Sequence, residues 1–177
     1  LGGNGVANST VFGGIAGDRM ADWVKAEGAW REPDKRQIAE SIARHEQPFG
    51  RAAGSLEPLR EALYELMWAD VGILRSAGSL QRALGALDRL DGELQATGVA
   101  DDGNRAFHMG WHDWLNLSSL ITVSRVIARS ALEREDSRGA HFREDFPERG
   151  PLPQSQVVVA RQPHGGALQL ERRPVRF

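Results

Sequence analysis

The chain has 177 residues, which corresponds to one domain or to one domain with an appendage. Hydrophobic residues make up 41% of it and charged residues 26%, as in a folded globular chain. The net charge of −2 gives no sign of nucleic-acid binding, and the absence of cysteine excludes disulfides, thiolate metal ligands and cysteine nucleophiles within the chain. No apolar run reaches the length of a membrane span, so we expect no direct span.

The first residues form a glycine-rich turn, Leu1-Gly2-Gly3-Asn4-Gly5, that leads directly into a helical pattern. Natural domains rarely begin inside such a turn, so we interpret Leu1 as a cut and expect a fragment. A glycine turn before a helix can hold a phosphate, but neither G-x-G-x-x-G nor a Walker lysine accompanies this one. Apolar residues recur at helical spacing from Val11 to Val24, and the glycines among them predict that another backbone packs closely against this helix.

Helical spacing of apolar residues predicts four further helices. Their expected bounds, inferred from capping residues, prolines and glycines, are Asp34 to Pro48, Ser55 to Gly72, Ser79 to Gly98, and about Trp111 to Asp136. Gly139 is expected to supply the left-handed residue that ends the last helix. Residues 156–160 and 167–171, which flank a Pro-His-Gly-Gly turn at 163–166, predict a β-hairpin.

A pair of histidines could indicate a metal site, and the tryptophans could indicate a nucleic-acid-binding surface, but the neighbouring residues favour neither. His108 and His112 are spaced to share one helix face, which permits a zinc or iron site. Gly110 weakens a helix there and no third ligand is evident, so a partly exposed pair near a helix start is favoured. The five tryptophans lack interleaved Lys and Arg, which favours packing in the core or between domains over stacking on nucleic acid.

The densest run of charges is residues 133–147. Glu133, Glu135 and Asp136 would crowd the C-terminal end of a helix, where the helix dipole disfavours negative charge. A solvated helix end with alternating charges is the simpler interpretation. The crowding favours instead an ordered ion network at an internal interface, for which the available partners are Arg134, Arg138 and Arg143.

Two segments together resemble the succinate dehydrogenase/fumarate reductase flavoprotein family, which includes L-aspartate oxidase. Leu1-Gly2-Gly3-Asn4 matches the end of the family's Arg-Leu-Gly-Gly-Asn motif. The family's Glu-Ser-Arg-Gly-Ala-His-x-Arg-x-Asp-(Phe/Tyr)-Pro stretch is similar to the segment from Asp136 to Pro147, which reads Asp-Ser-Arg-Gly-Ala-His-Phe-Arg-Glu-Asp-Phe-Pro. Residues 67–75 also look like the family's segment before its second bundle helix, so the resemblance covers about residues 1–150.

The resemblance implies a mainly α fold. It consists of a spectrin-like three-helix bundle with an N-terminal helix from an FAD-binding domain, and the predicted hairpin follows at the C-terminus. The implied parts are residues 1–28, the flavin-facing turn and helix at the end of the FAD-binding domain; residues 29–150, the helical bundle; and residues 151–177, the hairpin tail.

The resemblance also implies the site residues. Flavin contacts at the N-terminal turn fall on Gly3, Asn4, Gly5 and Val6, where a helix N-terminus would stabilise the negative charge of reduced flavin. Many family members have Ser where this chain has Gly5, so a hydroxyl donor is lost and only backbone N–H groups remain. The implied contacts with the neighbouring domain fall on Arg138, His141 and Arg143. No catalytic residue and no metal ligand is placed in this chain.

As a function, the resemblance implies the C-terminal part of an FAD-dependent oxidoreductase acting on a dicarboxylate. The implied partners are the FAD-binding domain of the same parent chain and an iron–sulfur subunit, in the cytoplasm or at the cytoplasmic membrane face through other subunits. We expect these residues alone to be inactive and not to bind FAD tightly. L-aspartate oxidase is the rival within the family, and a free-standing helical interaction module is the alternative outside it.

Overall fold

The structure is a computed structural model that describes residues 4–29, 31–151, 156–161 and 167–175. The chain divides into two compact units, Leu1–Ile42 and Ala43–Phe177. In the first unit, helix α1 (Asn4–Glu27) keeps its large apolar side chains exposed. Helix α2 (Lys35–Glu46) crosses the boundary between the units, and its start is capped as predicted, because Asp34 Oδ1 accepts from the Arg36 backbone N–H at 2.9 Å.

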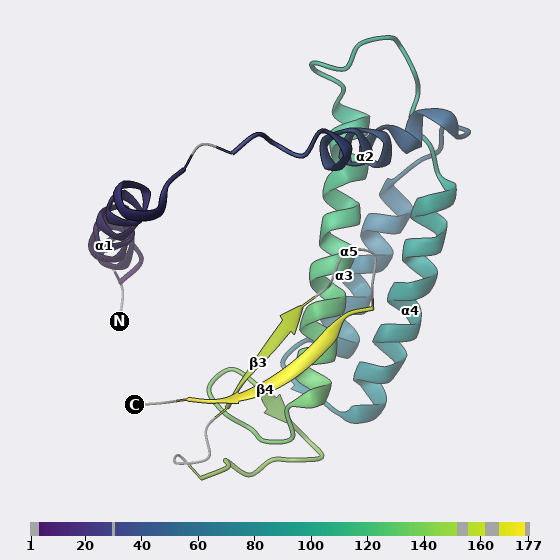
Figure 1. Ribbon diagram of the computed structural model, residues 1–177. Coiled ribbons are helices and arrows are strands. Elements are labelled where there is room, and N and C mark those ends of the chain that lie inside the picture. Colours follow the sequence, from purple (N-terminus) through teal and green to yellow (C-terminus); the bar gives the residue numbers. More distant parts are fainter. Residues whose placement is uncertain (1–3, 30, 152–155, 162–166, 176–177) are drawn as a thin grey trace. The chain divides into compact units, whose positions relative to one another are not determined.

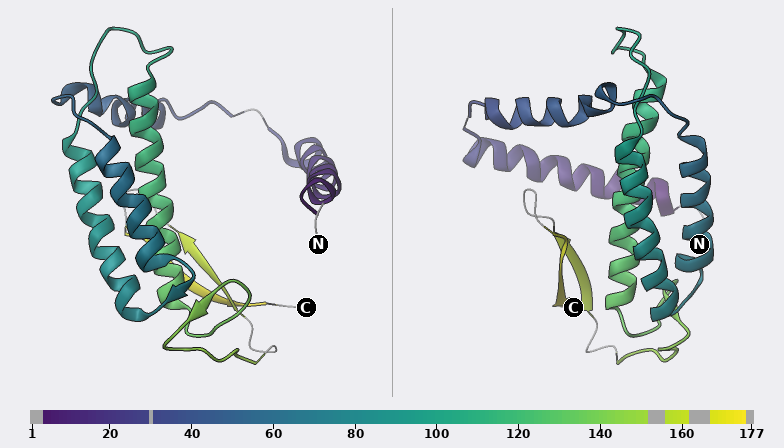
Figure 2. Two further views of the ribbon diagram at one scale, coloured as in Figure 1. Left: turned by 180° about the vertical axis from the view of Figure 1, so that it is seen from behind. Right: turned by 90° about the vertical axis from the view of Figure 1, so that its right-hand side faces the viewer.

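The second unit is built on three long helices, α3 (Glu57–Val71), α4 (Ala77–Ala96) and α5 (Met109–Glu133), which lie side by side (Figure 1, Figure 2). The apolar residues that recur at helical spacing face one another and form the core. Its most buried members, with 0–1% of their surface exposed, are Leu63, Leu80, Ala83, Leu87, Leu94, Leu117, Ile121 and Ala128. This confirms the predicted three-helix bundle.

The start of α4 differs from the prediction, because the capping residue is Ser76 and not Ser79. Ser76 has an extended backbone (φ −140°, ψ 163°), and its side chain accepts from the Ser79 N–H at 3.2 Å. The Ser79 hydroxyl accepts in return from the Ser76 N–H at 3.1 Å. The two serines thus form a reciprocal capping box, and the cap lies three residues before the predicted one.

The end of α5 also differs. The helix stops at Glu133, with Arg134 extended, so Gly139 does not terminate it. Gly139 does have a positive φ of 60°, but it lies in the tight turn that closes between Arg138 and His141. The prediction was right about the conformation of this glycine and wrong about its element, because the Arg143 side chain satisfies the last carbonyls of α5.

Short strands complete the second unit. Strand β1 (Leu74–Arg75) pairs in parallel with β2 (Phe142–Arg143), and a single-turn 3₁₀ helix, η1 (Gln47–Gly50), precedes α3. The predicted hairpin is confirmed as β3 (Gln156–Arg161) antiparallel to β4 (Gln169–Pro174), while its predicted turn at 163–166 lies outside the described residues. The hairpin packs beside α5 (Figure 1). None of the helices within the described ranges is long and apolar enough to cross a membrane.

Candidate functional site

Residues 134–150, which follow α5, fold back across the bundle. The parallel bridge sets Leu74 beside Phe142 and Arg75 beside Arg143. Because side chains alternate across a strand, one pair points outward and the other inward. Leu74 is exposed, whereas the Arg143 side chain is 1% exposed. Two residues of β1 therefore position a buried arginine at the end of α5.

Arg143 satisfies the C-terminus of α5. Its Nη1 donates to the carbonyls of Ala131 at 2.9 Å, Leu132 at 3.0 Å and Arg134 at 3.0 Å. The last carbonyls of a helix have no partner within the helix and carry the negative end of its dipole. A buried cation at this position supplies both the missing donors and the opposite charge.

Asp145 is the ion-pair partner of Arg143 and joins it to another helix. Its two carboxylate oxygens accept from Arg143 Nε at 2.7 Å and Nη2 at 2.8 Å. Asp145 Oδ2 also accepts from the Ala77 N–H at 2.8 Å, at the positive end of α4. The hydrogen bonds from Arg143 hold the pKa of the Asp145 carboxyl well below its usual range. The pair therefore ties the end of α5 to the start of α4.

His141 lies beside a second arginine. Arg75 Nη1 is 2.9 Å from His141 Nδ1, and His141 Nε2 is 3.4 Å from the Arg134 carbonyl. A guanidinium only donates, so Nδ1 accepts and Nε2 carries the proton. Burial, with Arg75, Arg134 and Arg143 nearby, lowers the pKa of His141 below its ordinary value of 6.5. His141 is therefore neutral at pH 7.

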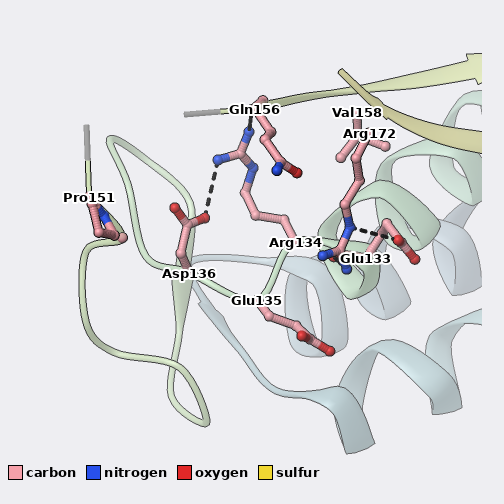
Figure 3. A pocket seen from close by; sticks show the side chains of 9 residues that line it. Glu133, Arg134, Glu135, Asp136, Pro151, Gln156, Val158 and Arg172 are labelled. Carbon is pink, nitrogen blue, oxygen red and sulfur yellow. Dashed lines mark hydrogen bonds and ion pairs between the residues drawn. The ribbon is translucent and has the colours of Figure 1, made fainter. Parts of the chain in front are cut away.

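A pocket of about 260 Å³ opens beside this segment, between the end of α5 and the hairpin (Figure 3). Arg134 donates to Asp136 Oδ1 at 3.1 Å and to the Gln156 carbonyl. On the other side, Arg172 Nε donates to Glu133 Oε1 at 2.8 Å. Two of the acidic residues of the wall, Glu133 and Asp136, are thus paired with its two arginines, and these contacts fasten the hairpin to α5.

The structure bears out one part of the predicted ion network, the pairing of Asp136 with arginines, whereas Glu133 pairs with Arg172 and Arg143 pairs with Asp145. Asp136, the residue at the centre of the crowding, pairs with Arg134 at 3.1 Å and with Arg138 at 3.5 Å. Arg138 Nη2 also donates to the Gly150 carbonyl at 2.7 Å. The structure brings the predicted contact residues Arg138, His141 and Arg143 together in one loop. Arg143 points into the bundle, and the contact of this loop with a neighbouring domain stays a prediction.

The predicted flavin contacts fall at the start of α1. Gly3 lies outside the described residues, while Asn4, Gly5 and Val6 form the first turn of the helix. The first turn holds no acidic residue, and a Cβ built on Gly5 meets nothing within 4 Å. The first backbone N–H groups of a helix have no acceptor within the helix, and this end of a helix attracts anionic groups.

Of the two histidines predicted to share a helix face, His108 has a structural role and His112 lies at the surface. His108 caps α5: its Nδ1 accepts from the Trp111 N–H at 2.9 Å, and its Nε2 lies 2.6 Å from the Ala100 carbonyl. His112 is exposed, and no cluster of three metal-ligating side chains occurs among the residues the structure describes. Core packing holds for Trp114, which is 4% exposed, while Trp23 and Trp68 are exposed at 61% and 78%.

Three residues of the network escaped the sequence reasoning: Arg75, Asp145 and Ser137. The Ser137 hydroxyl accepts from the Arg143 N–H at 2.9 Å and donates to the Phe146 carbonyl at 2.8 Å, which closes the loop. Arg75 lies in the connection predicted between Gly72 and Ser79, 66 residues before His141, its partner. The β1–β2 pairing brings Arg75 and His141 together, and strands of two residues leave no recognisable pattern in a sequence.

Comparison with known proteins identifies the class of protein to which this fold belongs. The fold and the loop belong to the C-terminal helical region of a flavoprotein. The family described as "Fumarate reductase flavoprotein C-term" matches residues 60–177. The chain belongs to this family, which confirms the resemblance inferred from the two sequence segments.

Individual relatives agree. One subunit of the CoM/CoB fumarate reductase from Methanothermobacter marburgensis is 34% identical over 92% of this chain and 29% of its own length. The fumarate reductase flavoprotein subunit of Haemophilus influenzae is 29% identical over 100% of this chain and 30% of its own. A solved structure, the apo Sdh1 complex of Mycobacterium smegmatis, contains a chain with 26% identity and a TM-score of 0.78, matched over 89% of this chain and 27% of that one.

These matches confirm the mainly α fold and the family. They also show that the chain spans about 30% of the length of the two curated relatives, in the region that the family's name places at the C-terminus. The chain is thus similar to the C-terminal part of flavoprotein subunits, which favours the flavoprotein over a free-standing interaction module.

Proposed function

We propose that the complete polypeptide is an FAD-dependent oxidoreductase that interconverts a dicarboxylate and its unsaturated counterpart, and that this chain completes and supports its flavin site. The observation that carries the proposal is the family match over residues 60–177, together with relatives named as fumarate reductase subunits. The parts are proposed as residues 1–28 at the end of the FAD-binding domain, residues 29–150 as the helical bundle and residues 151–177 as the hairpin tail.

The contribution of this chain to the flavin is electrostatic. The turn of Gly3, Asn4, Gly5 and Val6 would direct the N-terminus of α1 at the pyrimidine end of the isoalloxazine ring. Reduction of flavin at N5 places negative charge near N1 and the C2 carbonyl. The N-terminus of a 24-residue helix with no acidic residue in its first turn stabilises that charge.

The second contribution is support. The Arg138–His141 turn and the Arg143 anchor would hold the surface on which the FAD-binding domain rests. An iron–sulfur subunit is the proposed electron partner, and the assembly is proposed to be cytoplasmic or to lie at the cytoplasmic membrane face through other subunits. FAD is proposed to be held by the complete polypeptide, since this chain supplies only one edge of its site.

The test uses the complete polypeptide that contains this sequence. We expect it to be yellow with bound flavin and to oxidise a reduced viologen dye when fumarate is added. Gly5→Asp would place a carboxylate at the N-terminus of α1, which favours the helix but opposes negative charge on flavin, so we expect a lower flavin reduction potential. Ala26→Asp, at the other end of the same helix, is the matched control.

Two results would contradict the proposal. A colourless polypeptide would show that no flavin is bound. A flavin-loaded protein whose potential is unchanged by Gly5→Asp would place the N-terminus of α1 away from the cofactor.

A further inference from the structure

The chain contains the dipeptide Asp-Gly twice, at Asp91-Gly92 and at Asp102-Gly103. Glycine has no Cβ to hinder a close approach to its backbone nitrogen. When glycine follows aspartate, this nitrogen can therefore attack the aspartate side chain: an N–Cγ bond forms, and the carboxyl OH leaves with the amide proton as water. Water then opens the resulting succinimide ring at either carbonyl. Opening at the main-chain carbonyl gives isoaspartate, in which the backbone runs through the side chain.

The fold protects the first of the two dipeptides. Asp91-Gly92 lies inside α4, where the Gly92 N–H is engaged in the helical hydrogen bonding. The Asp91 carboxylate accepts from Arg125 Nη2 at 3.2 Å and from Gln95 Nε2 at 3.4 Å. Ring closure at this position would have to break both contacts and the helix around them.

The second dipeptide lies in the loop that joins α4 to α5 and extends beyond the end of the bundle (Figure 1, Figure 2). The Asp102 side chain is 63% exposed, and Gly103 has a positive φ of 76°. His108 Nε2 is 4.0 Å from Asp102 Oδ1 but lies closer to the Ala100 carbonyl, at 2.6 Å. Ring closure at Asp102 therefore disturbs no helix and no close ion pair of this carboxylate.

Two hydrogen bonds in the loop act on the reacting groups. The Gly103 N–H donates to Asp101 Oδ1 at 3.0 Å, and the Asn104 N–H donates to Asp102 Oδ1 at 2.9 Å. Asp101 is ionised, because hydrogen bonds from Arg105 and Gly103 lower its pKa to about 2. Its carboxylate therefore increases the electron density on the attacking nitrogen. The bond from Asn104 polarises the carboxyl group that is attacked.

The same loop holds Arg105 in place. Arg105 Nη1 and Nη2 donate to the two carboxylate oxygens of Asp101 at 2.8 and 3.2 Å. The guanidinium carbon lies 3.5 Å from the centre of the Phe49 ring. Isoaspartate at residue 102 lengthens the backbone between Asp101 and Arg105 by one methylene group. The ion pair that closes this part of the loop then loses its register.

We propose that Asp102 is a site of spontaneous isomerisation to isoaspartate in the folded protein, that Asp91 is protected from the same reaction, and that isomerisation loosens the Asp101–Arg105 pair. The inference concerns the chemistry of this chain's own residues and does not depend on the proposed function.

The two sites can be compared within one peptide. No Lys or Arg lies between Arg89 and Arg105, so trypsin releases both dipeptides together in residues 90–105. The complete polypeptide is aged in a mildly acidic buffer, which favours the protonated carboxyl that loses water, with and without denaturing urea. Electron-transfer dissociation of the peptide then locates isoaspartate. We expect it at both positions in urea, and at residue 102 but not at residue 91 in the folded protein.

Asp102→Glu is the matched variant, because it keeps the carboxylate but would have to close a less favourable six-membered ring. We expect the variant to lose isoaspartate formation at residue 102. A folded protein with no isoaspartate at residue 102, or with as much at residue 91, would overturn the proposal. Absence of isoaspartate at residue 91 in urea would show that the helix is not what protects Asp91.

A second measurement follows the consequence for Arg105. Brief trypsin treatment of the folded polypeptide cuts exposed loops that can leave their native conformation. We expect cleavage after Arg105 to be faster in the aged protein than in the fresh protein, and ageing to leave the rate unchanged in Asp102→Glu. Equal rates in aged and fresh unmodified protein, with isoaspartate present at residue 102, would contradict the loosening of the Asp101–Arg105 pair.

Discussion

Helices α1 and α4 have similar sequence patterns and lie in opposite environments. α4 has 20 residues and buries Leu80, Ala83, Leu87 and Leu94 completely, at 0% exposure. α1 has 24 residues, yet Phe12, Trp23 and its other large apolar side chains are more than half exposed. The comparison teaches that periodicity identifies the apolar face of a helix but not what covers it. For α4 the cover is within the described unit, and for α1 we propose that it is the FAD-binding domain.

The largest expected effect is the loss of stability when a buried side chain of α4 is truncated. Leu87→Ala should lower the free energy of unfolding by about 2–5 kcal/mol, because it leaves a cavity in a fully packed core. Ile15→Ala, at a 51% exposed position of α1, should change it by less than about 0.5 kcal/mol in the 177-residue chain. Urea denaturation measures both. Equal losses would show that α1 is packed as tightly as α4.

The next effect concerns the end of α5. Arg143→Ala leaves the carbonyls of Ala131, Leu132 and Arg134 without their donor and Asp145 without its ion-pair partner. We expect a loss of about 1–3 kcal/mol, because the buried carbonyls at the end of α5 lose their hydrogen-bond donor. Arg143→Lys keeps the positive charge but lacks the planar guanidinium, so its stability should lie between that of the unmodified protein and that of Arg143→Ala.

The control for this series is Arg89→Ala, on the exposed side of α4. Thermal denaturation of the four proteins separates the contributions of charge and geometry. If Arg143→Ala proved as mild as Arg89→Ala, the helix end would be satisfied by other groups and the anchoring role would be wrong.

A smaller effect is expected at the start of α4. Ser76→Ala removes the side chain that accepts from the Ser79 N–H, and a lost helix cap costs about 1 kcal/mol. Ser55→Ala, at an exposed serine ahead of α3, is the matched control and should be close to neutral. A shift in the urea midpoint for Ser76→Ala alone checks the corrected cap, whereas a neutral Ser76→Ala would restore the original assignment to Ser79.

The sequence was sufficient for the bundle because its signals are local. Leu80, Leu87 and Leu94 recur at helical spacing, and this repetition fixes which face is buried wherever the helix packs. The charge crowding at Glu133, Glu135 and Asp136 likewise predicted that arginines must gather at the end of α5. Both inferences follow from neighbours along one helix.

The rest of the candidate site depends on contacts that no local pattern contains. Arg143 was expected to neutralise the acidic cluster, but it pairs with Asp145 and donates to backbone carbonyls. Gly139 was expected to end α5, because a left-handed glycine is common at that position. The β1–β2 bridge decides both outcomes, since it draws Arg143 under the helix and leaves Gly139 to the following turn.

The smallest expected effect is a pH dependence that isolates His141. Its pKa in the folded protein lies below the ordinary 6.5, because burial and nearby arginines oppose its charge. As the pH falls through about 6.5, the unfolded state binds a proton more readily than the folded state, so stability present above that pH is lost.

His141→Gln can accept from Arg75 and donate to the Arg134 carbonyl without titrating. We therefore expect the free energy of unfolding, measured by urea denaturation between about pH 7.5 and about pH 5.5, to depend less steeply on pH in the variant than in the unmodified protein. Asp145 does not contribute in this window, because its lowered pKa confines its effect to pH values below its ordinary 3.8. Identical slopes for the two proteins would mean that His141 titrates alike in both states, and the neutral Arg75–His141 contact would then be wrong.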